Sequence, residues 1–156
     1  MGRLYTANFK AVAATVQQDF FELLAGTNKP IKVHAWQLAQ STEIGDAMEE
    51  GLVVACKRGV GSTTGSGGTA PTATPVSVDD TAAGATVEVN NTTKMSAGTI
   101  TVLEAHVWNV RVPYMMVYTP EMRPYIKPGD RWTLELETTP ADSITLSGTI
   151  WFEELG

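Results

Sequence analysis

Apolar and polar residues alternate strictly in two segments near the C-terminal end of the chain. In residues 131–137, "RWTLELE", apolar side chains occupy positions 132, 134 and 136, with polar ones between them. A period of two is typical of a strand with one buried face, so this segment predicts a half-buried strand. Residues 143–155, "SITLSGTIWFEEL", alternate similarly, and the positions predicted to face inward are Ile144, Leu146, Ile150 and Phe152. Gly148 in this run predicts a bulge or the close approach of another element.

The remaining strand predictions rest on less regular patterns. Strand-like runs occupy residues 3–12, 31–40, 51–58 and 85–91. Residues 98–112 alternate with a slip near Glu104, which predicts either a bulge or a strand that is covered on both faces. Residues 15–26, "TVQQDFFELLAG", fit a helix or a strand. We favour a bulged strand, because the neighbouring segments all have the pattern of strands.

These segments predict about eight strands and no long helix. Strands separated by turn signals are typical of two packed sheets, so we predict one all-β domain over residues 1–156, an antiparallel β-sandwich of the jelly-roll type. Residues 59–86, rich in Gly, Ser, Thr and Pro, then form a long loop between the fourth and fifth strands. Loops of this length are uncommon in compact domains and are usually functional or disordered.

An ordered conformation of this loop requires compensating contacts. Fixing the backbone costs on the order of 1 kcal/mol per residue, and more at glycine. We therefore predict that contacts from outside the domain hold the loop. Val76 and Val78 are the predicted anchors, as a short added strand or clasp on a neighbour, and the same contact region includes Asp79 and Asp80.

Charge and composition narrow the classes of partner. The chain carries 17 acidic and 11 basic residues, giving a formal net charge of −6, and 18% of its residues are charged. An acidic chain without a basic run is poorly suited to bind nucleic acid, so we expect none. No apolar run approaches the roughly 20 residues of a membrane span, so we expect no membrane association. The low charge favours a protein that buries much of its surface against other proteins.

Candidate catalytic and metal-binding residues are few. Cys56 is the one cysteine of the chain, and its apolar neighbours predict a small core residue. His34 and His106 each precede a Trp by two residues, so each is predicted to share a face with that Trp. A metal site would combine the two histidines with Glu104 in a cupin-like barrel, but two histidines spaced along one strand are absent. We favour a satisfied, semi-buried imidazole or a polar–aromatic surface, and expect no catalytic residue, cofactor or metal.

Residues 112–125, "VPYMMVYTPEMRPY", concentrate apolar side chains in a segment broken by prolines. Tyr and Met are enriched in the cores of protein interfaces. The alternative is a segment that wraps across the open end of the sandwich and caps it. We favour a homo-oligomer interface, most simply a trimer, made by Tyr114, Met115, Met116, Tyr118 and Trp151.

The order of segments from "QDFFELLA" (18–25) and "KPIKVHAWQLAQ" (29–40) to "PGDRWTLELETTPADSITLSGTIWFEE" (128–154) resembles a family of small structural proteins encoded among the virion genes of tailed phages and prophages. Small β-sandwich proteins in such gene blocks are often capsid decoration, or cement, proteins, which sit as trimers on the capsid and clamp major capsid subunits. The resemblance implies a head decoration protein on the outer surface of the virion capsid, assembled in the host cytoplasm. It also implies that the 59–86 loop contacts the major capsid protein.

Two alternatives stay open at this point. One is a tail or head–tail connector protein, which copy number in purified virions would separate from a decoration protein. The other is a carbohydrate-binding jelly roll on the virion surface, for which exposed Trp36, Trp108 and Trp151 would serve as stacking platforms for host glycans. An enzyme is the class that the sequence favours least.

Overall fold

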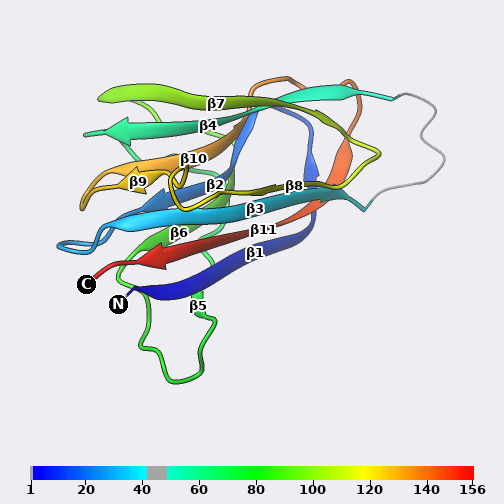
Figure 1. Cartoon of the computed structure of the whole chain (residues 1–156). Coiled ribbons are helices and arrows are strands. Elements are labelled where there is room, and N and C mark those ends of the chain that lie inside the picture. The colour runs from blue at the N-terminus through cyan, green and yellow to red at the C-terminus, as the bar shows by residue number, and fades with distance from the viewer. Residues whose placement is uncertain (1, 42–48) are drawn as a thin grey trace.

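Antiparallel strands make up the computed structural model, which describes residues 2–41 and 49–156 (Figure 1). Within these residues the strands are β1 Arg3–Ala14, β2 Gln18–Leu24, β3 Ile31–Gln40, β4 Gly51–Val60, β5 Thr74–Pro75, β6 Thr86–Asn91, β7 Thr99–Asn109, β8 Tyr114–Val117, β9 Tyr125–Ile126, β10 Arg131–Leu136 and β11 Ile144–Glu154. The prediction of about eight strands was too low, because β5, β8 and β9 have only two to four residues and are too short to show an alternating pattern. In the described part of the chain, no helix has the length and apolarity needed to cross a membrane.

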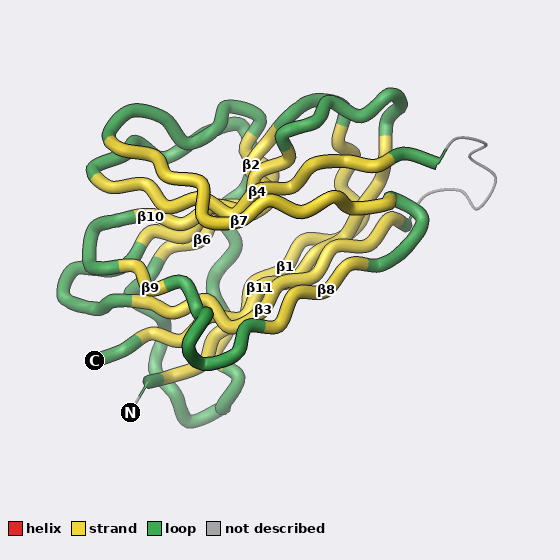
Figure 2. Tube along the Cα trace, turned by 45° about the horizontal axis from the view of Figure 1, so that its top comes forward, coloured by secondary structure: helices red, strands yellow, loops and turns green. Residues whose placement is uncertain are grey.

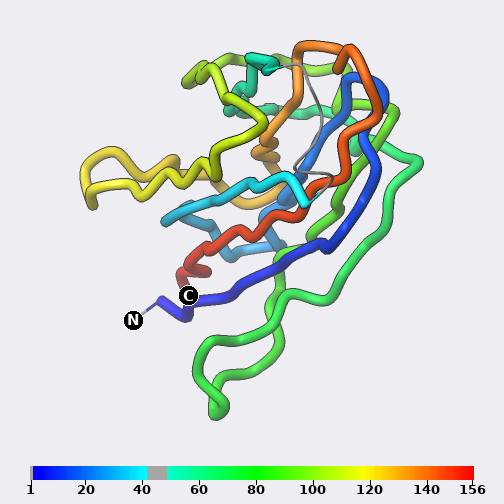
Figure 3. The backbone as a smooth tube through the Cα atoms, turned by 90° about the vertical axis from the view of Figure 1, so that its right-hand side faces the viewer, coloured from blue at the N-terminus to red at the C-terminus, as the bar shows by residue number. Residues whose placement is uncertain are grey.

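The strands form two sheets that pack as a sandwich, as the sequence predicts. Sheet A has the order β5-β1-β11-β3-β8, with β9 also paired to β3, and sheet B has the order β6-β2-β10-β4-β7. Eight of the strands pair in a nested way: β1 with β11, β2 with β10, β3 with β8 and β4 with β7. Figure 3 shows β1, β11 and β3 (blue, red and cyan) side by side in one layer.

The core lies between the inner faces of the two sheets. Ile144, Leu146, Ile150 and Phe152 are buried there, so the predicted inward face of β11 is confirmed. Each such large apolar side chain contributes about 1.5–3 kcal/mol by leaving water. The close approach predicted at Gly148 is also confirmed. Phe9 of β1 is its cross-strand partner, and a Cβ at Gly148 would lie 2.8 Å from the Phe9 ring.

Two irregular strands contain bulges where the sequence pattern slips. In β2, Phe21 faces Leu134 and Asp19 faces Glu135, so Phe20 is the extra residue and the predicted bulged strand is confirmed. In β7, the register shifts between the partners of Cys56 and Lys57, which makes Leu103 the extra residue, next to Glu104. A bulge moves the side chains that follow it to the other face, which explains why both patterns look ambiguous in the sequence.

The long insertion between β4 and β7 belongs to the same sandwich. Its β5 extends sheet A beyond β1, and its β6 extends sheet B beyond β2. Its two arms also pair with each other through the bridges Thr63–Ser96, Ser66–Thr93 and Thr69–Val89. The prediction that contacts from outside the domain must hold this loop is therefore wrong, since its own sheets and arms provide hydrogen bonds.

The insertion covers polar residues on the outer face of sheet B. The backbone N–H of Gly65 donates to Oε2 of Glu22 at 2.9 Å, and the N–H of Met95 donates to Oδ2 of Asp19 at 2.7 Å. Thr133 and Glu135 of β10 are buried on the same face. The prediction that β10 is half-buried is wrong for this reason: loop segments shield its polar face from water.

The close packing of the insertion over Glu22 can be tested by a substitution at Gly65. A Cβ at this position would lie 2.4 Å from the carbonyl oxygen of Thr93, so the backbone must shift to accept a side chain. We expect Gly65→Ala to lower the free energy of unfolding by about 1–3 kcal/mol in urea titrations, the usual cost of overpacking. Ser66→Ala, at the exposed next residue, is the control and should change it by less than about 0.5 kcal/mol. Equal stability of the two variants would contradict the close packing of the insertion at Gly65.

Buried Asp19 predicts a pH-dependent stability. Burial raises the pKa of Asp19 from its ordinary value of 3.8 to about 7; the Met95 N–H opposes the rise, and the charges of Glu135 and Glu22 add to it. The folded state therefore binds this proton more tightly than the unfolded chain, and the resulting stabilisation is lost as the pH rises through 7. We expect the free energy of unfolding to fall between pH 4 and pH 7, by at most about 1.4 kcal/mol per pH unit from this group.

Unfolding measured across this pH range in Asp19→Asn checks the assignment. The variant should show a shallower decline, with a remainder from Glu22, whose pKa burial also raises. Asp79→Asn, at an exposed carboxylate on the insertion, should decline as the wild type does. A decline that is unchanged in Asp19→Asn would rule out this residue as its source.

Candidate assembly surface

Strands β7 and β8 form one side of the sandwich, which we call the β7/β8 edge. β7 is the last strand of sheet B, β8 is the last strand of sheet A, and a short connection joins them (Figure 2). Between 37% and 71% of each apolar side chain in the following set is exposed along this segment: Ile100, Val102, Leu103, Val107, Val112, Met115 and Val117. The chain thus exposes a row of apolar side chains along β7, around the connection and back along β8.

The strand registers explain why these side chains face solvent. On β7, Val102 lies opposite Lys57 and Val107 lies opposite Val53, so both follow the outer face of sheet B. On β8, Met115 lies opposite Gln37 on the outer face of sheet A. The alternate residues of β8 turn inward and pack against the core. A partner that covers the β7/β8 edge would therefore meet apolar side chains on both sheets.

The two sides of the sandwich differ in how their edge strands are covered. On the opposite side, the insertion adds β5 to β1 and β6 to β2. β7 has 11 residues, contains no Pro or Lys, and carries Glu104 as its single charged residue. Natural proteins usually protect long edge strands with charges, prolines or covering segments, since an unprotected edge pairs readily with another chain. Strands β7 and β8 themselves contain no proline, lysine or arginine, and the positive charge and the proline of this side, Arg111 and Pro113, lie in the connection between them.

A polar network lies beneath the β7/β8 edge, centred on the hydroxyl of Tyr118. This hydroxyl accepts a hydrogen bond from Nε1 of Trp36 at 3.2 Å and donates one to Oε2 of Glu104 at 3.1 Å. The Sγ of Cys56 lies 3.4 Å from the same hydroxyl. Tyr118 is buried, and burial raises its pKa. Its ring thus links strands of both sheets without carrying charge.

His106 completes this network, which we call the edge cluster. Its Nε2 lies 3.1 Å from Oε2 of Glu104, and its Nδ1 lies 2.9 Å from the hydroxyl of Tyr114. The Tyr114 ring stacks on Trp36, with ring centroids 5.3 Å apart. The semi-buried, hydrogen-bonded imidazole favoured from the sequence is confirmed for His106.

Cys56 lies in the core, as predicted, and its environment determines its chemistry. Burial raises the pKa of the Cys56 thiol to about 12; the Tyr118 hydroxyl opposes the rise, and the charge of Glu104 adds to it. The thiolate is the nucleophilic form of cysteine. At neutral pH the buried thiol is therefore protonated, and the cluster offers no sulfur nucleophile.

The structure separates the five residues predicted to form an oligomer interface. Met115 is exposed on β8, whereas Tyr114 and Met116 are half-buried against the core. Tyr118 is buried within the chain, so it has no surface to offer a partner. Trp151 is half-buried on the central strand β11, and its cross-strand partners are Thr6 and Ala35. The exposed valines of β7 were missed, although the slipped pattern near Glu104 already marked this strand as unusual.

Two predictions about histidine and tryptophan faces were wrong. Trp36 and Trp108, proposed as exposed platforms for sugars, are each only 1% exposed. His34 is the extra residue of a bulge in β3, since Trp151 faces Ala35 and Phe152 faces Val33. This bulge turns His34 outward to Glu153, with 3.0 Å between Nε2 and Oε2, while Trp36 points into the core. His34 and Trp36 therefore lie on opposite faces of β3, whereas the two-residue spacing predicted that they share one.

The predicted contact loop projects from the sandwich near β5 (Figure 1). The backbone N–H of Val76 donates to the carbonyl of Leu4 at 2.9 Å, but the Val76 side chain is exposed. Val78 is 96% exposed, Asp79 is exposed, and Asp80 lies 3.4 Å from Arg3 in an ion pair. Hence the backbone anchors this tip to sheet A, and the two valine side chains remain available to a partner.

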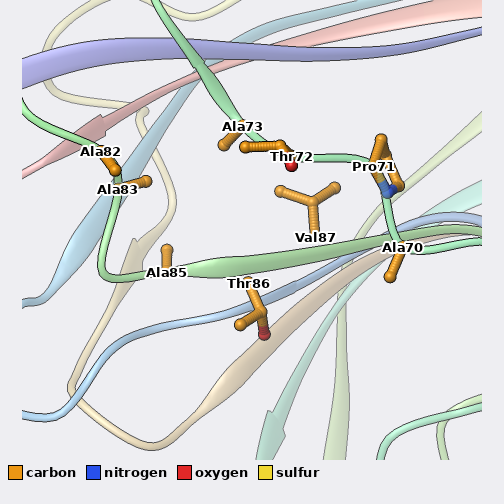
Figure 4. A pocket seen from close by; sticks show the side chains of 9 residues that line it. All are labelled: Ala70, Pro71, Thr72, Ala73, Ala82, Ala83, Ala85, Thr86 and Val87. Carbon is orange, nitrogen blue, oxygen red and sulfur yellow. The ribbon is translucent and has the colours of Figure 1, made fainter.

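A groove of about 250 Å³ lies between the two arms of the insertion, behind this tip. Figure 4 shows Val87 of β6 pointing toward the segment 71–73, with Ala82, Ala83 and Ala85 on the other arm. The residues that line the groove are small and uncharged. Such a lining can accept an apolar group but offers no charged anchor for a polar ligand.

Comparisons with known proteins do not assign this chain to a family. No protein-family model matches the sequence, and no curated protein matches it. Among solved structures, a chain from the structure of infectious bursal disease virus, Gx strain, matches 98% of this chain and 39% of its own length, at 13% sequence identity and a TM-score of 0.14. This chain thus spans less than half of that protein, and so low a TM-score carries no argument about fold or function.

Proposed function

We propose that this protein is a structural virion subunit of a tailed bacteriophage, and specifically a head decoration (cement) protein. The observation that carries the proposal is the apolar β7/β8 edge, whose two strands expose apolar side chains and contain no lysine or arginine. Surfaces of this kind mark sites of protein–protein contact. The phage assignment comes from the resemblance in segment order described above, and the edge is consistent with that resemblance.

The nested strand pairs support classifying the sandwich as a jelly roll. Pairing β1 with β11, β2 with β10, β3 with β8 and β4 with β7 corresponds to one long hairpin rolled into two sheets. The two arms of such a hairpin alternate between sheets, and double-sheet jelly rolls use this arrangement. In this classification β5 and β6 are additions made by the insertion, and β9 is an addition that pairs with the first two residues of β3.

In this proposal, one surface contacts sister subunits and another contacts the capsid. The β7/β8 edge joins sister subunits, most simply as a trimer, and Met115 is the member of the originally predicted interface that is best exposed for this contact. The insertion tip, with Val76, Val78, Asp79 and Asp80, contacts the major capsid protein on the outer surface of the capsid. A trimer presents three such tips, so that weak contacts with the shell reinforce one another through avidity.

Sedimentation of an edge variant tests the oligomer assignment. Val107→Asp combined with Val117→Asp places a carboxylate on each sheet at the β7/β8 edge. Burying unpaired charges in an interface is costly, so we expect the trimer to weaken at least tenfold and monomer to predominate. Val78→Asp, at the insertion tip, is the matched control and should remain trimeric. A wild-type chain that sediments as a monomer, or an unaffected double variant, would exclude this interface.

Binding to empty capsids of the parent virus tests the second surface. We expect Val78→Asp to bind at least tenfold more weakly while its sedimentation is unchanged, because it alters the tip but not the edge. Imaging of wild-type virions then separates decoration from other locations. Copies over the whole shell support a decoration protein, whereas a single ring at one vertex would indicate a connector and overturn the proposal. Binding to host polysaccharide in place of capsids would also overturn it.

A further inference from the structure

We propose that Cys56, Glu104 and His106 form a binding site for a divalent transition-metal ion of the zinc type, beneath the β7/β8 edge. The three residues are brought together by strand pairing. Cys56 on β4 lies directly opposite Glu104 on β7, and His106 follows two residues later on the same face of β7. Taking one ligand atom from each residue, all three atoms lie within 4.8 Å of one another.

The spacing of the polar atoms is close to that of a tetrahedral site. With metal–ligand distances of about 2.0–2.3 Å, neighbouring ligands of a tetrahedral zinc ion lie roughly 3.3–3.8 Å apart. Oε2 of Glu104 lies 3.1 Å from Nε2 of His106 and 3.1 Å from the Tyr118 hydroxyl, which is itself 3.4 Å from Sγ of Cys56. Small outward shifts would admit the ion, with Tyr118 or a water at the fourth position.

The orientation of His106 matches that of a metal ligand. Metal-binding histidines usually donate the N–H of the other ring nitrogen to a nearby acceptor, which fixes the tautomer and the ring orientation. Nδ1 of His106 lies 2.9 Å from the Tyr114 hydroxyl, and Tyr114 is held by stacking on Trp36. When the ion replaces the hydrogen bond between Nε2 and Glu104, the ring carries its proton on Nδ1 and Nε2 offers its lone pair to the metal. Tyr114 is therefore a positioning residue for this ligand.

Charge balance explains why a buried site would accept this ion. When the metal–sulfur bond forms, the Cys56 thiol releases its proton to solvent and becomes a thiolate. The thiolate and the Glu104 carboxylate together then balance the two charges of the divalent cation, so the occupied site is neutral. Sulfur and imidazole ligands select zinc-like ions over Mg²⁺ and Ca²⁺, which prefer oxygen. Glu104 and His106 are partly exposed, which gives the ion a route from solvent.

Cobalt titration of the reduced, metal-free protein tests the proposal. Because the chain has one cysteine, a thiolate-to-cobalt charge-transfer absorption in the wild type reports ligation by Cys56 without any substitution. We expect the absorption to saturate at one Co²⁺ per chain and to disappear when Zn²⁺ is added. Cobalt binding without this absorption, or no binding, would overturn the proposal.

Three variants identify the other groups. His106→Gln should weaken cobalt binding at least tenfold, and Tyr114→Phe should weaken it about 10–100-fold through loss of the ring's orienting partner. His34→Gln is the matched control, since His34 also pairs with a carboxylate, Glu153, but on the outer face of sheet A. It should bind as the wild type does, and an equal loss in His34→Gln would overturn the assignment. If His106→Gln fails to fold, as judged by circular dichroism, the wild-type absorption and Tyr114→Phe decide the matter.

Discussion

The unpaired edges of the two sheets are the constraint on which the rest of this molecule depends. A sheet ends in strands whose outward N–H and C=O groups lack a partner, and a sandwich has two such sides. On one side, the insertion supplies β5 to sheet A and β6 to sheet B. To reach both sheets it must cross the outer face of sheet B, and this path accounts for the buried Glu22, the tightly packed Gly65 and the covered polar face of β10. A segment that resembles a linker in composition thus serves as an edge cover.

The other side of the sandwich is built differently. β7 and β8 belong to different sheets, and side chains connect them where they follow one another around the edge. Tyr114 at the start of β8 reaches His106, and Tyr118 just after β8 reaches Glu104. These hydrogen bonds hold the edge closed from within while the outward faces of both strands remain apolar. Because these hydrogen bonds already order the edge in the free protein, binding a partner does not carry the free-energy cost of ordering it. This favours a defined contact surface.

The sequence predicted regular strands well and features that depend on distant segments poorly. The inward face of β11 follows from local alternation at Ile144, Leu146, Ile150 and Phe152, and the bulges in β2 and β7 appear as local slips. Burial of Thr133 and Glu135 depends on loop residues far along the chain, which no local pattern reports. The bulge at His34 does shift the buried positions, from Ile31 and Val33 to Trp36 and Leu38. The apolar Ala35 continues the first alternation, however, and hides the shift.

The edge cluster illustrates the same limit for function. Cys56 and Glu104 become neighbours only through the register of β4 and β7, which the sequence does not specify. The spacing rules that detect metal ligands on one strand or helix cannot detect ligands assembled across a strand pair. The exposed apolar residues of β7 were likewise present in the sequence, but only the sheet order makes β7 an edge strand.

The pairing of β1 with β11 has a consequence for how the chain acquires this structure. These strands come from opposite ends of the sequence, and β11 lies between β1 and β3 in sheet A. The middle of sheet A is therefore missing until β11 has been synthesised. During synthesis from the N-terminus, β1 and β3 are available early but must wait for β11 to join them. Such non-local pairing slows folding and leaves apolar strands exposed in the meantime. A nascent chain in which β11 has not yet been made would therefore leave β1 and β3 unpaired at the centre of sheet A and depend on chaperones.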